Sequence, residues 1–331
     1  MKLPTDRILV TGGAGFIGSA LVHGLNQKGH TNIHVVDRLG TDEKWKNLTP
    51  LVFNDYLEAD ELMDYVNSHP HSRPYSLILH LGACSSTMET DASYLIENNY
   101  RFTHRLAQYA LHTKTRFVYA SSAATYGDGT NGMDDTENAV QVFRPMNMYG
   151  YSKQMFDLHA QQNGWLKSIT GLKYFNVFGP NENHKGEMCS LVNKAYHQIQ
   201  ETGRLKLFRS HNPDFEDGKQ LRDFLYIKDA VEMTLHLAKT QDATGLYNLG
   251  SGKAHTWLDL AHAIFKAMGK EPQIDFIDIP ESIRDKYQYK TEADISKLRE
   301  TGYEQPVTPL EEAVADYIQN YLEPGKYLGD G

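Results

Sequence analysis

A tyrosine and a lysine lie four residues apart in the stretch "NMYGYSKQMF", which begins at Asn147. On a helix, Tyr149 and Lys153 would share one face, one turn apart. Free tyrosine has a pKa of about 10, and a nearby ammonium favours the phenolate and lowers that pKa. The pair would then make a usable proton acceptor. Because this spacing also arises often by chance, the pair alone does not establish catalysis.

A glycine-rich turn lies near the start of the chain. The stretch "TGGAGFIG" places Gly12, Gly15 and Gly18 between an expected strand and an expected helix. Glycines at this point let the backbone approach a pyrophosphate, which binds at the positive end of the helix. Asp37, at the end of the next expected strand, stands where an acidic residue would hold the adenosine ribose of a dinucleotide.

The residues around Asp37 leave the choice between NAD and NADP open. A carboxylate favours a free ribose hydroxyl and therefore NAD. Arg38, Lys44 and Lys46 follow closely, and basic side chains there would neutralise the 2′-phosphate of NADP. The two lysines are equally compatible with a solvated loop.

Two serines follow the fifth expected strand in "YASSAATYG". Ligands of open parallel sheets bind outside the carboxyl ends of the strands, so the hydroxyl of Ser121 or Ser122 would meet a substrate alcohol there. Either serine could instead cap a turn. The sequence has no GxSxG motif, and "LGSGKAH" lacks the leading Gly and the final Ser/Thr of a phosphate-binding loop, so acyl and phosphate transfer are excluded.

Apolar, β-branched runs alternate with amphipathic runs through the first half of the chain. This alternation indicates a parallel sheet covered on both faces, and right-handed crossovers make it a doubly wound, Rossmann-type α/β fold. The expected strands are 7–12, 32–37, 76–83, 116–122, 171–179 and 245–252, the expected helices are 16–29 and 93–113, and a strand followed by a helix is expected within 223–240.

The pattern changes after Gly179 and predicts a smaller α/β substrate lobe. Helices are expected at 189–203, 256–269 and 308–322, a strand at 273–280, and a charged, exposed segment at 209–223. The length of 331 residues suits two lobes, and no linker separates them. We expect a dinucleotide-binding domain over 1–176 plus about 223–255, and a substrate domain over about 177–222 plus 256–331.

Composition excludes several classes of function. The chain carries 33 basic and 42 acidic residues, a net charge of −9, and no basic tract, which argues against nucleic-acid binding. No apolar run reaches 18 residues and no signal peptide is evident, so no membrane association is expected. Two distant cysteines without a CxxC motif suit a reduced, cytoplasmic compartment. No HExxH motif or His/Cys cluster suggests a metal, and "HPH" (69–71) is interpreted as an exposed turn.

Taken together, the glycine turn, a serine after the fifth strand and the Tyr-x-x-x-Lys pair resemble the extended short-chain dehydrogenase/reductase superfamily over the whole chain. "RDFLYIKD" (222–229) and "YNLGSG" (247–252) are similar to later motifs of this group. The resemblance implies that Tyr149 is the acid/base, that Lys153 lowers its pKa and holds the nicotinamide ribose, and that Ser122 positions the substrate hydroxyl.

Further segments resemble one branch of that superfamily, the ADP-L-glycero-D-manno-heptose 6-epimerases. They include "HLGACSSTMET", "ENNYRFTHRL", "KYFNVFGPNENHKGEM" and "YQYKTEADISKL". This resemblance implies an isomerase that inverts C6″ of an ADP-heptose by transient oxidation, for lipopolysaccharide core synthesis. It further implies one tightly bound NADP per subunit, with NAD as the alternative, and a homo-oligomer, for which a homopentamer is the candidate assembly.

Inversion of a carbon centre asks for proton transfer on two sides. The clamped sugar presents its carbonyl oxygen on opposite sides in the two half-reactions, and one fixed Tyr149 reaches only one of them. The resemblance implies that Lys185, in "NHKG", serves the other side. On its own residues Lys185 would be a solvated loop lysine.

The resemblance also implies a set of binding positions. For the cofactor these are Gly12, Gly15, Phe16, Ile17, Gly18, Asp37, Arg38, Lys44, Leu81, Gly82, Ala83, Cys84, Ser85, Asn98, Lys153, Val177 and Lys185; for the ADP-sugar they are Ser122, Asn176, Glu187, Lys194, Phe208, Arg222 and Tyr287. The chain departs from the family at Ala59, where a cofactor-contacting lysine is expected, and at 211–220, which looks like an insertion. The missing lysine weakens the expectation of NADP.

Other functions remain as alternatives. A UDP-sugar 4-epimerase or a reductase would use the same motifs, and a reductase would release its cofactor at each turnover. A dehydratase would usually need an acidic residue after Ser122, where Ala123 and Ala124 stand. A catalytically inactive dinucleotide sensor would not need to retain Ser122, Tyr149, Lys153 and Lys185 together.

Overall fold

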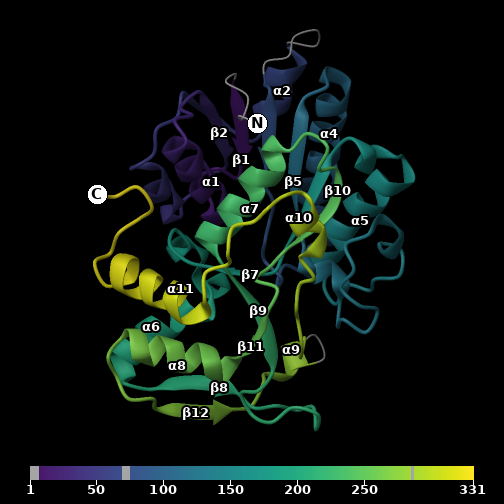
Figure 1. Cartoon of the computed structure of the whole chain (residues 1–331). Helices are drawn as coiled ribbons and strands as arrows, with labels where there is room; N and C mark the ends of the chain where they lie inside the picture. The colour runs from purple at the N-terminus through teal and green to yellow at the C-terminus, as the bar shows by residue number, and fades with distance from the viewer. Residues whose placement is uncertain (1–6, 69–74, 285–286) are drawn as a thin grey trace.

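Seven parallel strands form the central sheet in the order β10-β6-β5-β4-β1-β2-β3 (Figure 1). The computed structural model describes residues 7–68, 75–284 and 287–331, and the turn expected at 69–71 lies outside them. The strands are β1 (Ile8–Thr11), β2 (Ile33–Asp37), β3 (Asp55–Glu58), β4 (Leu77–His80), β5 (Arg116–Ser122), β6 (Thr170–Tyr174) and β10 (Gly245–Leu249). The predicted doubly wound fold is confirmed, and the strand order reverses between β1 and β4.

Helices cover both faces of this sheet. α1 (Phe16–Gln27) and α7 (Ile227–Lys239) pack together on one face, and α2 (Leu62–Asn67), α4 (Phe102–Thr113) and α5 (Met148–Gln162) lie on the other. Apart from the half-exposed edge strand β3, the strands are largely buried on both sides, which explains why they are apolar nearly throughout. Among the described residues, no helix has both the length and the apolar character to cross a bilayer.

The helix expected at 93–113 is interrupted. It consists of α3 (Ala92–Leu95), a π-helical turn (Ile96–Arg101) and α4. At the wide turn, the buried Asn99 amide donates to the Cys84 carbonyl and to Ser152 Oγ, both at 2.9 Å, and accepts from Cys84 N. π-Turns within helices often lie at functional sites, and this one ties the segment after β4 to α5.

The smaller lobe is built from later parts of the chain and lies below the central sheet in Figure 1. One sheet has the order β11-β9-β7 and a second pairs β12 with β8. The strands are β7 (Asn176–Phe178), β8 (Leu205–Phe208), β9 (Leu221–Tyr226), β11 (Ala254–Thr256) and β12 (Ile274–Ile277); the helices are α6 (Leu191–Thr202), α8 (Trp257–Ala267), α9 (Glu281–Arg284), α10 (Ser296–Glu300) and α11 (Leu310–Tyr317), which continues into a π-turn (Ile318–Leu322). The predicted domain boundaries stay a prediction.

Several elements differ from the sequence-based expectation. The single strand expected at 171–179 is broken at Phe175 into β6 and β7, which belong to different sheets. The strands β3 and β8 were not expected, because both are short and half-exposed. The helix α2 was not expected either, because it has only six residues. The segment expected to be exposed over 209–223 is largely so only to residue 220, with Gly218 and Gln220 buried; Arg222 and Asp223 are buried because they belong to β9.

Candidate active site

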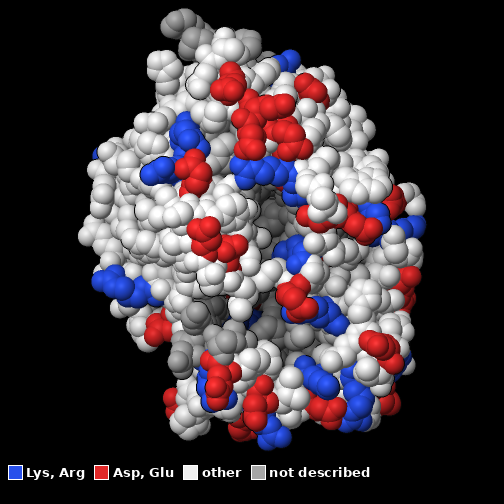
Figure 2. Space-filling view, turned by 180° about the vertical axis from the view of Figure 1, so that it is seen from behind, with Lys and Arg blue, Asp and Glu red and all other residues white. Residues whose placement is uncertain are grey.

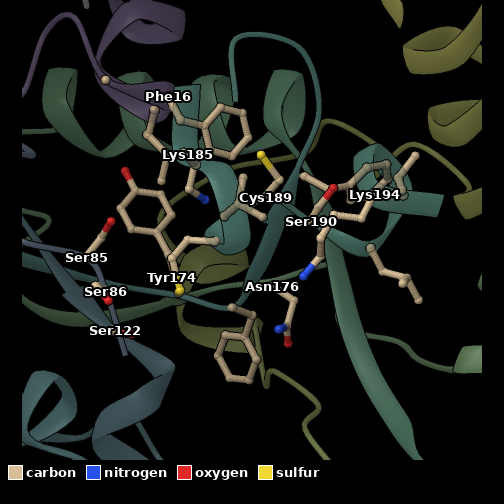
Figure 3. A pocket seen from close by; sticks show the side chains of 18 of the residues that line it. Phe16, Ser85, Ser86, Ser122, Tyr174, Asn176, Lys185, Cys189, Ser190 and Lys194 are labelled. Atoms are coloured by element: carbon tan, nitrogen blue, oxygen red, sulfur yellow. The ribbon is translucent and has the colours of Figure 1, made fainter. Parts of the chain in front are cut away.

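A cavity of about 1020 Å³ opens at the carboxyl ends of β1, β4, β5 and β6 and extends to the smaller lobe. This is the edge where open parallel sheets bind ligands. Figure 3 shows Ser85, Ser86 and Ser122 on one side of this cavity and Ser190 and Lys194 on the opposite side. The sequence-predicted residues that line it are Gly12, Gly15, Phe16, Ile17, Gly18, Asp37, Lys44, Leu81, Gly82, Ala83, Cys84, Ser85, Ser122, Tyr149, Lys153, Asn176, Val177, Lys185, Lys194, Phe208 and Tyr287.

The glycine turn is shaped by backbone contacts. Gly12 has φ +67°, and a Cβ at Gly18 would lie 1.9 Å from the Gly12 carbonyl oxygen, so neither position accepts a side chain without strain. Gly15 precedes α1, and no side chain caps the first turn of this helix, which also contains no acidic residue. The free N–H groups and the helix dipole there suit a pyrophosphate.

Asp37 is tied to the glycine turn. Its Oδ2 accepts from Ala14 N at 2.9 Å and Gly15 N at 3.1 Å, and its Oδ1 forms an ion pair with Lys44 Nζ at 3.0 Å. Asp37 therefore holds the turn in shape as well as facing the cavity. The bond to Lys44 neutralises the carboxylate, so this side of the cavity has little net charge of its own.

Arg38 and Asn98 line an adjacent cavity of about 410 Å³. The Arg38 guanidinium donates to the Asn98 side-chain oxygen and pairs with Asp60 at 2.5 Å, and this pairing raises its pKa. Ala59 also lines this cavity. The second cavity extends from the glycine turn and would accept the adenosine end of a dinucleotide.

α5 presents Tyr149 and Lys153 to the end of β5. Asn147 caps the helix by accepting from Gly150 N at 2.8 Å, which fixes where α5 begins. Lys153 is buried, and its Nζ donates to the Ala120 carbonyl oxygen at 2.9 Å. Ser122 hydrogen-bonds the Tyr149 hydroxyl and also caps the following turn.

The pKa values of this pair differ from the sequence-based expectation. Burial raises the pKa of Tyr149, and the hydrogen bond with Ser122 offsets part of this rise. Burial also lowers the pKa of Lys153 to about 8. The expected lowering of the Tyr149 pKa by the lysine is not found, because the Lys153 ammonium is directed to the Ala120 carbonyl.

Both serines line the cavity, but their side chains have different partners. Ser121 is buried and donates to Asp157 Oδ2 at 2.7 Å, whereas Ser122 is half-buried and contacts Tyr149. The alternation of side chains along a strand separates them. The structure therefore places Ser122 toward the reacting groups, as the sequence resemblance implied.

Lys185 reaches the cavity from the 3₁₀ segment Asn183–Met188, and its Nζ lies 5.0 Å from the centre of the Phe16 ring (Figure 3). The start of this loop is anchored by the buried Glu182, whose carboxylate accepts from Ser190 N at 2.7 Å and Ser190 Oγ at 2.6 Å. Burial raises the pKa of Glu182. The lysine thus lies on a loop that is tied at both ends.

The substrate side of the cavity is aromatic. Phe208 and Tyr287 meet edge to face with ring centres 6.4 Å apart, and Trp257 Nε1 donates to the Tyr287 hydroxyl at 2.8 Å. Arg222 is buried behind this wall, 5.1 Å from the Tyr287 ring, and donates to the carbonyls of Leu221 and Gln288. Arg222, which was expected to contact the ADP-sugar, therefore does not line either cavity.

Glu187 and the segment 211–220 also lie away from the two cavity linings. Glu187 is exposed, and its carbonyl accepts from Lys194 Nζ at 3.1 Å. In the 211–220 segment, Phe215 packs on Tyr289 with ring centres 5.4 Å apart. This segment therefore supports the outer side of the substrate lobe.

Sequence reasoning missed several lining residues. These are mainly apolar or uncharged and come from the smaller lobe and the lysine loop: His184, Met188, Cys189, Ser190, Leu191, Gln198, Leu205, Leu207, Trp257 and Leu260. His184 and Met188 lie within the segment "KYFNVFGPNENHKGEM", whereas no motif marks the others, which reach the cavity only through tertiary packing. Cys84 and Cys189 are both free thiols, and among the described residues no cluster could hold a metal ion.

The face seen in Figure 2 has a deep hollow with Lys and Arg side chains at its border, beside several Asp and Glu side chains. Positive charge beside a concave site favours an anionic ligand. The uncapped start of α1, the glycine turn and the buried lysine of α5 fit a nicotinamide dinucleotide, whose pyrophosphate would be held by the glycine turn. Fold and site together define a dinucleotide-dependent enzyme of the doubly wound class.

A model of the NAD dependent epimerase/dehydratase family matches residues 8–250, and the chain belongs to this family. It is 50% identical over 314 residues to the ADP-L-glycero-D-manno-heptose-6-epimerase of Nitratidesulfovibrio vulgaris (strain Hildenborough), an alignment covering 95% of this chain and 97% of that protein. It is 43% identical over 324 residues to the enzyme of the same name from Fusobacterium nucleatum, covering 95% and 98%.

Solved structures agree with the fold. The Helicobacter pylori ADP-L-glycero-D-manno-heptose-6-epimerase is similar with a TM-score of 0.80 and 26% identity, covering 96% of each chain. The UDP-glucose 4-epimerase of Thermus thermophilus, solved in complex with NAD, has a TM-score of 0.76 and 23% identity, covering 95% and 98%. At that identity the second likeness concerns the fold alone.

Proposed function

We propose that this chain is an ADP-glycero-manno-heptose 6-epimerase, which interconverts the two configurations at C6″ of an ADP-linked heptose. The observation that carries the proposal is that Tyr149 and Lys185 line one cavity, in a chain that is 50% identical to a heptose epimerase over nearly its whole length. Two proton-transfer groups in one site are what inversion requires.

A bound nicotinamide would accept a hydride from C6″ and return it to the other face of the resulting ketone. Tyr149 would exchange the hydroxyl proton of the substrate in one half-reaction. Its hydrogen bond with Ser122 orients the phenol and opposes the effect of burial on its pKa. Ser122 would position the same substrate hydroxyl, because it lies beside Tyr149 at the end of β5.

Lys185 would exchange the proton in the other half-reaction. It comes from the loop that follows β7, whereas Tyr149 comes from α5, so the two groups approach from different elements. Asn176 and Lys194, on the same side of the cavity as this loop, would contact the ADP-sugar. Glu187 and Arg222, which were also expected to contact the ADP-sugar, do not line the cavity, so any effect on substrate binding would be indirect.

The cofactor proposal is a nicotinamide dinucleotide, one per subunit, bound tightly enough to survive purification. The preference for NADP over NAD comes from the family resemblance, and the residues Arg38, Lys44 and Lys46 are only compatible with it. Pairing of Arg38 with Asp60 and of Lys44 with Asp37 occupies both cations, which favours NAD. The cofactor released from the denatured protein should be identified by mass spectrometry, which separates the two directly.

The family resemblance suggests a compartment, an assembly and a pathway for the reaction. We propose that the enzyme acts in the cytoplasm as a homo-oligomer, with a homopentamer as the candidate assembly, and that its product is a precursor of lipopolysaccharide core heptose. Analytical ultracentrifugation would determine the assembly. A sedimentation coefficient of a monomer at micromolar concentration would contradict this part of the proposal.

Incubation with ADP-D-glycero-D-manno-heptose, without added cofactor, should yield the L-glycero form, followed by NMR of C6″. Tyr149→Phe and Lys185→Ala should each slow conversion by about 10²-fold or more, the range for general acid–base groups. Near-normal turnover of Lys185→Ala in both directions would remove the lysine from the mechanism. Turnover of UDP-galactose in place of the heptose would favour a 4-epimerase.

A further inference from the structure

A buried carboxylate lies one turn beyond Lys153 on α5. Asp157 has no exposed surface, and its Oδ1 accepts from the Tyr119 hydroxyl at 2.8 Å. Its Oδ2 accepts from Ser121 Oγ at 2.7 Å and from Lys173 Nζ at 3.0 Å. The proposed mechanism uses neither Asp157 nor Lys173, although burying two charges is costly.

Lys173 connects this carboxylate to the turn after Ser122. It lies on β6, is completely buried, and donates to Thr125 Oγ1 at 2.6 Å. Its Nζ also lies 4.8 Å from the centre of the Tyr126 ring. The Asp157–Lys173 pair therefore links α5, β5, β6 and the turn Ala123–Tyr126 from behind the cavity.

Successive turns of α5 contact consecutive residues of β5. Asp157 binds the side chains of Tyr119 and Ser121, and Lys153 binds the carbonyl of Ala120 between them. Residues four apart on a helix share a face, so Lys153 and Asp157 both point to the strand. Displacing Asp157 would shift the strand that supplies the Lys153 acceptor.

We propose that Asp157, held by Lys173, is a positioning residue of the reaction: it fixes α5 against the end of β5 and so keeps the Lys153 ammonium at the Ala120 carbonyl. This inference rests on the proposed use of Lys153 in the reaction. It concerns residues behind the cavity, which touch neither substrate nor cofactor.

The charges around Lys153 agree with this role. Burial lowers its pKa, while Asp157 and, to a smaller extent, Cys84 raise it. Lys153 itself contributes to lowering the pKa of His80 on β4, which burial brings to about 3, so His80 is neutral and adds no charge. Lys173 contacts Asp157 Oδ2 and Thr125 Oγ1, and it is not among the groups that shift the Lys153 pKa.

The test is a double substitution, Asp157→Asn/Lys173→Gln, which removes both charges and leaves no unpaired ion. NMR of ¹⁵Nζ-labelled lysine, with the Lys153 signal assigned through Lys153→Arg, would report its titration without any turnover. Because the net charge behind the site is unchanged, the effect would come from displacement of Lys153 from the Ala120 carbonyl, which stabilises the ammonium. We expect the midpoint to fall by about one pH unit and the alkaline limb of the kcat profile to move with it.

Asp157→Asn alone is the second variant, because it removes the same charge with one isosteric change if the double variant does not fold. Asp157→Glu keeps the charge and should restore the Lys153 midpoint. Asp229→Asn is the matched control: this buried carboxylate on α7 binds Thr308 N and Oγ1, both at 2.9 Å, away from the site. It should leave the titration unchanged.

An unchanged Lys153 midpoint in a folded variant that lacks Asp157 would overturn the inference, as would an equal shift in Asp229→Asn. These outcomes are separable from failure of the proposed function. If the wild-type protein does not convert the heptose, the NMR titration still tests the link between Asp157 and Lys153.

Discussion

The side-chain nitrogen of Lys185 lies 5.0 Å from the centre of the Phe16 ring. Phe16 is the first residue of α1, directly after the glycine turn, so the loop lysine rests against the element proposed to bind the cofactor pyrophosphate. The contact joins two parts of the chain that lie far apart in sequence. It gives Lys185 a defined place beside the cofactor, which a solvated loop lysine would lack.

Phe16→Leu should reduce turnover because it removes the ring face while it keeps most of the apolar volume. A cation–π contact is worth about 0.5–2 kcal/mol, which corresponds to about a 2- to 30-fold loss. Steady-state rates with the heptose substrate would measure the effect, and Phe16→Tyr should retain the wild-type rate. Equal rates for the leucine variant would mean that the ring does not position Lys185.

Glu182→Ala should destabilise the protein by about 1–3 kcal/mol, the cost of leaving a buried hydrogen-bonding group without its partner. The substitution removes the acceptor of Ser190 N and Oγ and frees the loop that carries Lys185. Urea unfolding would measure the change. The exposed Glu187 offers a matched control, because Glu187→Ala in the same loop should leave the unfolding free energy within about 0.5 kcal/mol of wild type.

Gly18→Ala should abolish binding of the nicotinamide dinucleotide, whereas Gly15→Ala should only weaken it. A Cβ at Gly18 would meet the Gly12 carbonyl oxygen at 1.9 Å, so the turn must move; a Cβ at Gly15 lies 3.2 Å from that oxygen and keeps φ near −71°. Fluorescence titration of cofactor-free protein would give both affinities, with circular dichroism as a check of folding. Wild-type affinity in Gly18→Ala would contradict the pyrophosphate assignment.

Turnover should fall as the pH rises through about 8, because burial lowers the pKa of Lys153 to that value and the deprotonated amine no longer serves as an ammonium. Stability should follow the opposite course. Between about pH 8 and 10.4 the unfolded lysine, whose pKa is about 10.4, still binds a proton that the folded lysine has lost. The free energy of unfolding should therefore rise with pH across this range, because the cost of burying the charged lysine is removed. A kcat profile that stays flat to about pH 10 would contradict the assignment.

Much of the dinucleotide half was readable from local patterns. A parallel strand buried on both faces is apolar nearly throughout, and a turn that approaches phosphate needs glycine at set positions, so β1, β2, β4, β5 and the turn after β1 were all predicted. β3 and β8 were not, because a short strand at the edge of a sheet alternates with exposed residues and resembles a loop. The break at Phe175 was also missed, since β6 and β7 form one apolar run.

The sequence by itself determined the fold class, the glycine turn and the spacing of Tyr149 and Lys153, because each depends on interactions within a few residues along the chain. Only the tertiary structure decided which serine binds Asp157, where Arg222 lies, and that Asp157 and Lys173 form a buried pair behind the site. Such relationships join elements from distant parts of the chain. They depend on how the sheet, α5 and the smaller lobe pack, which no local pattern encodes.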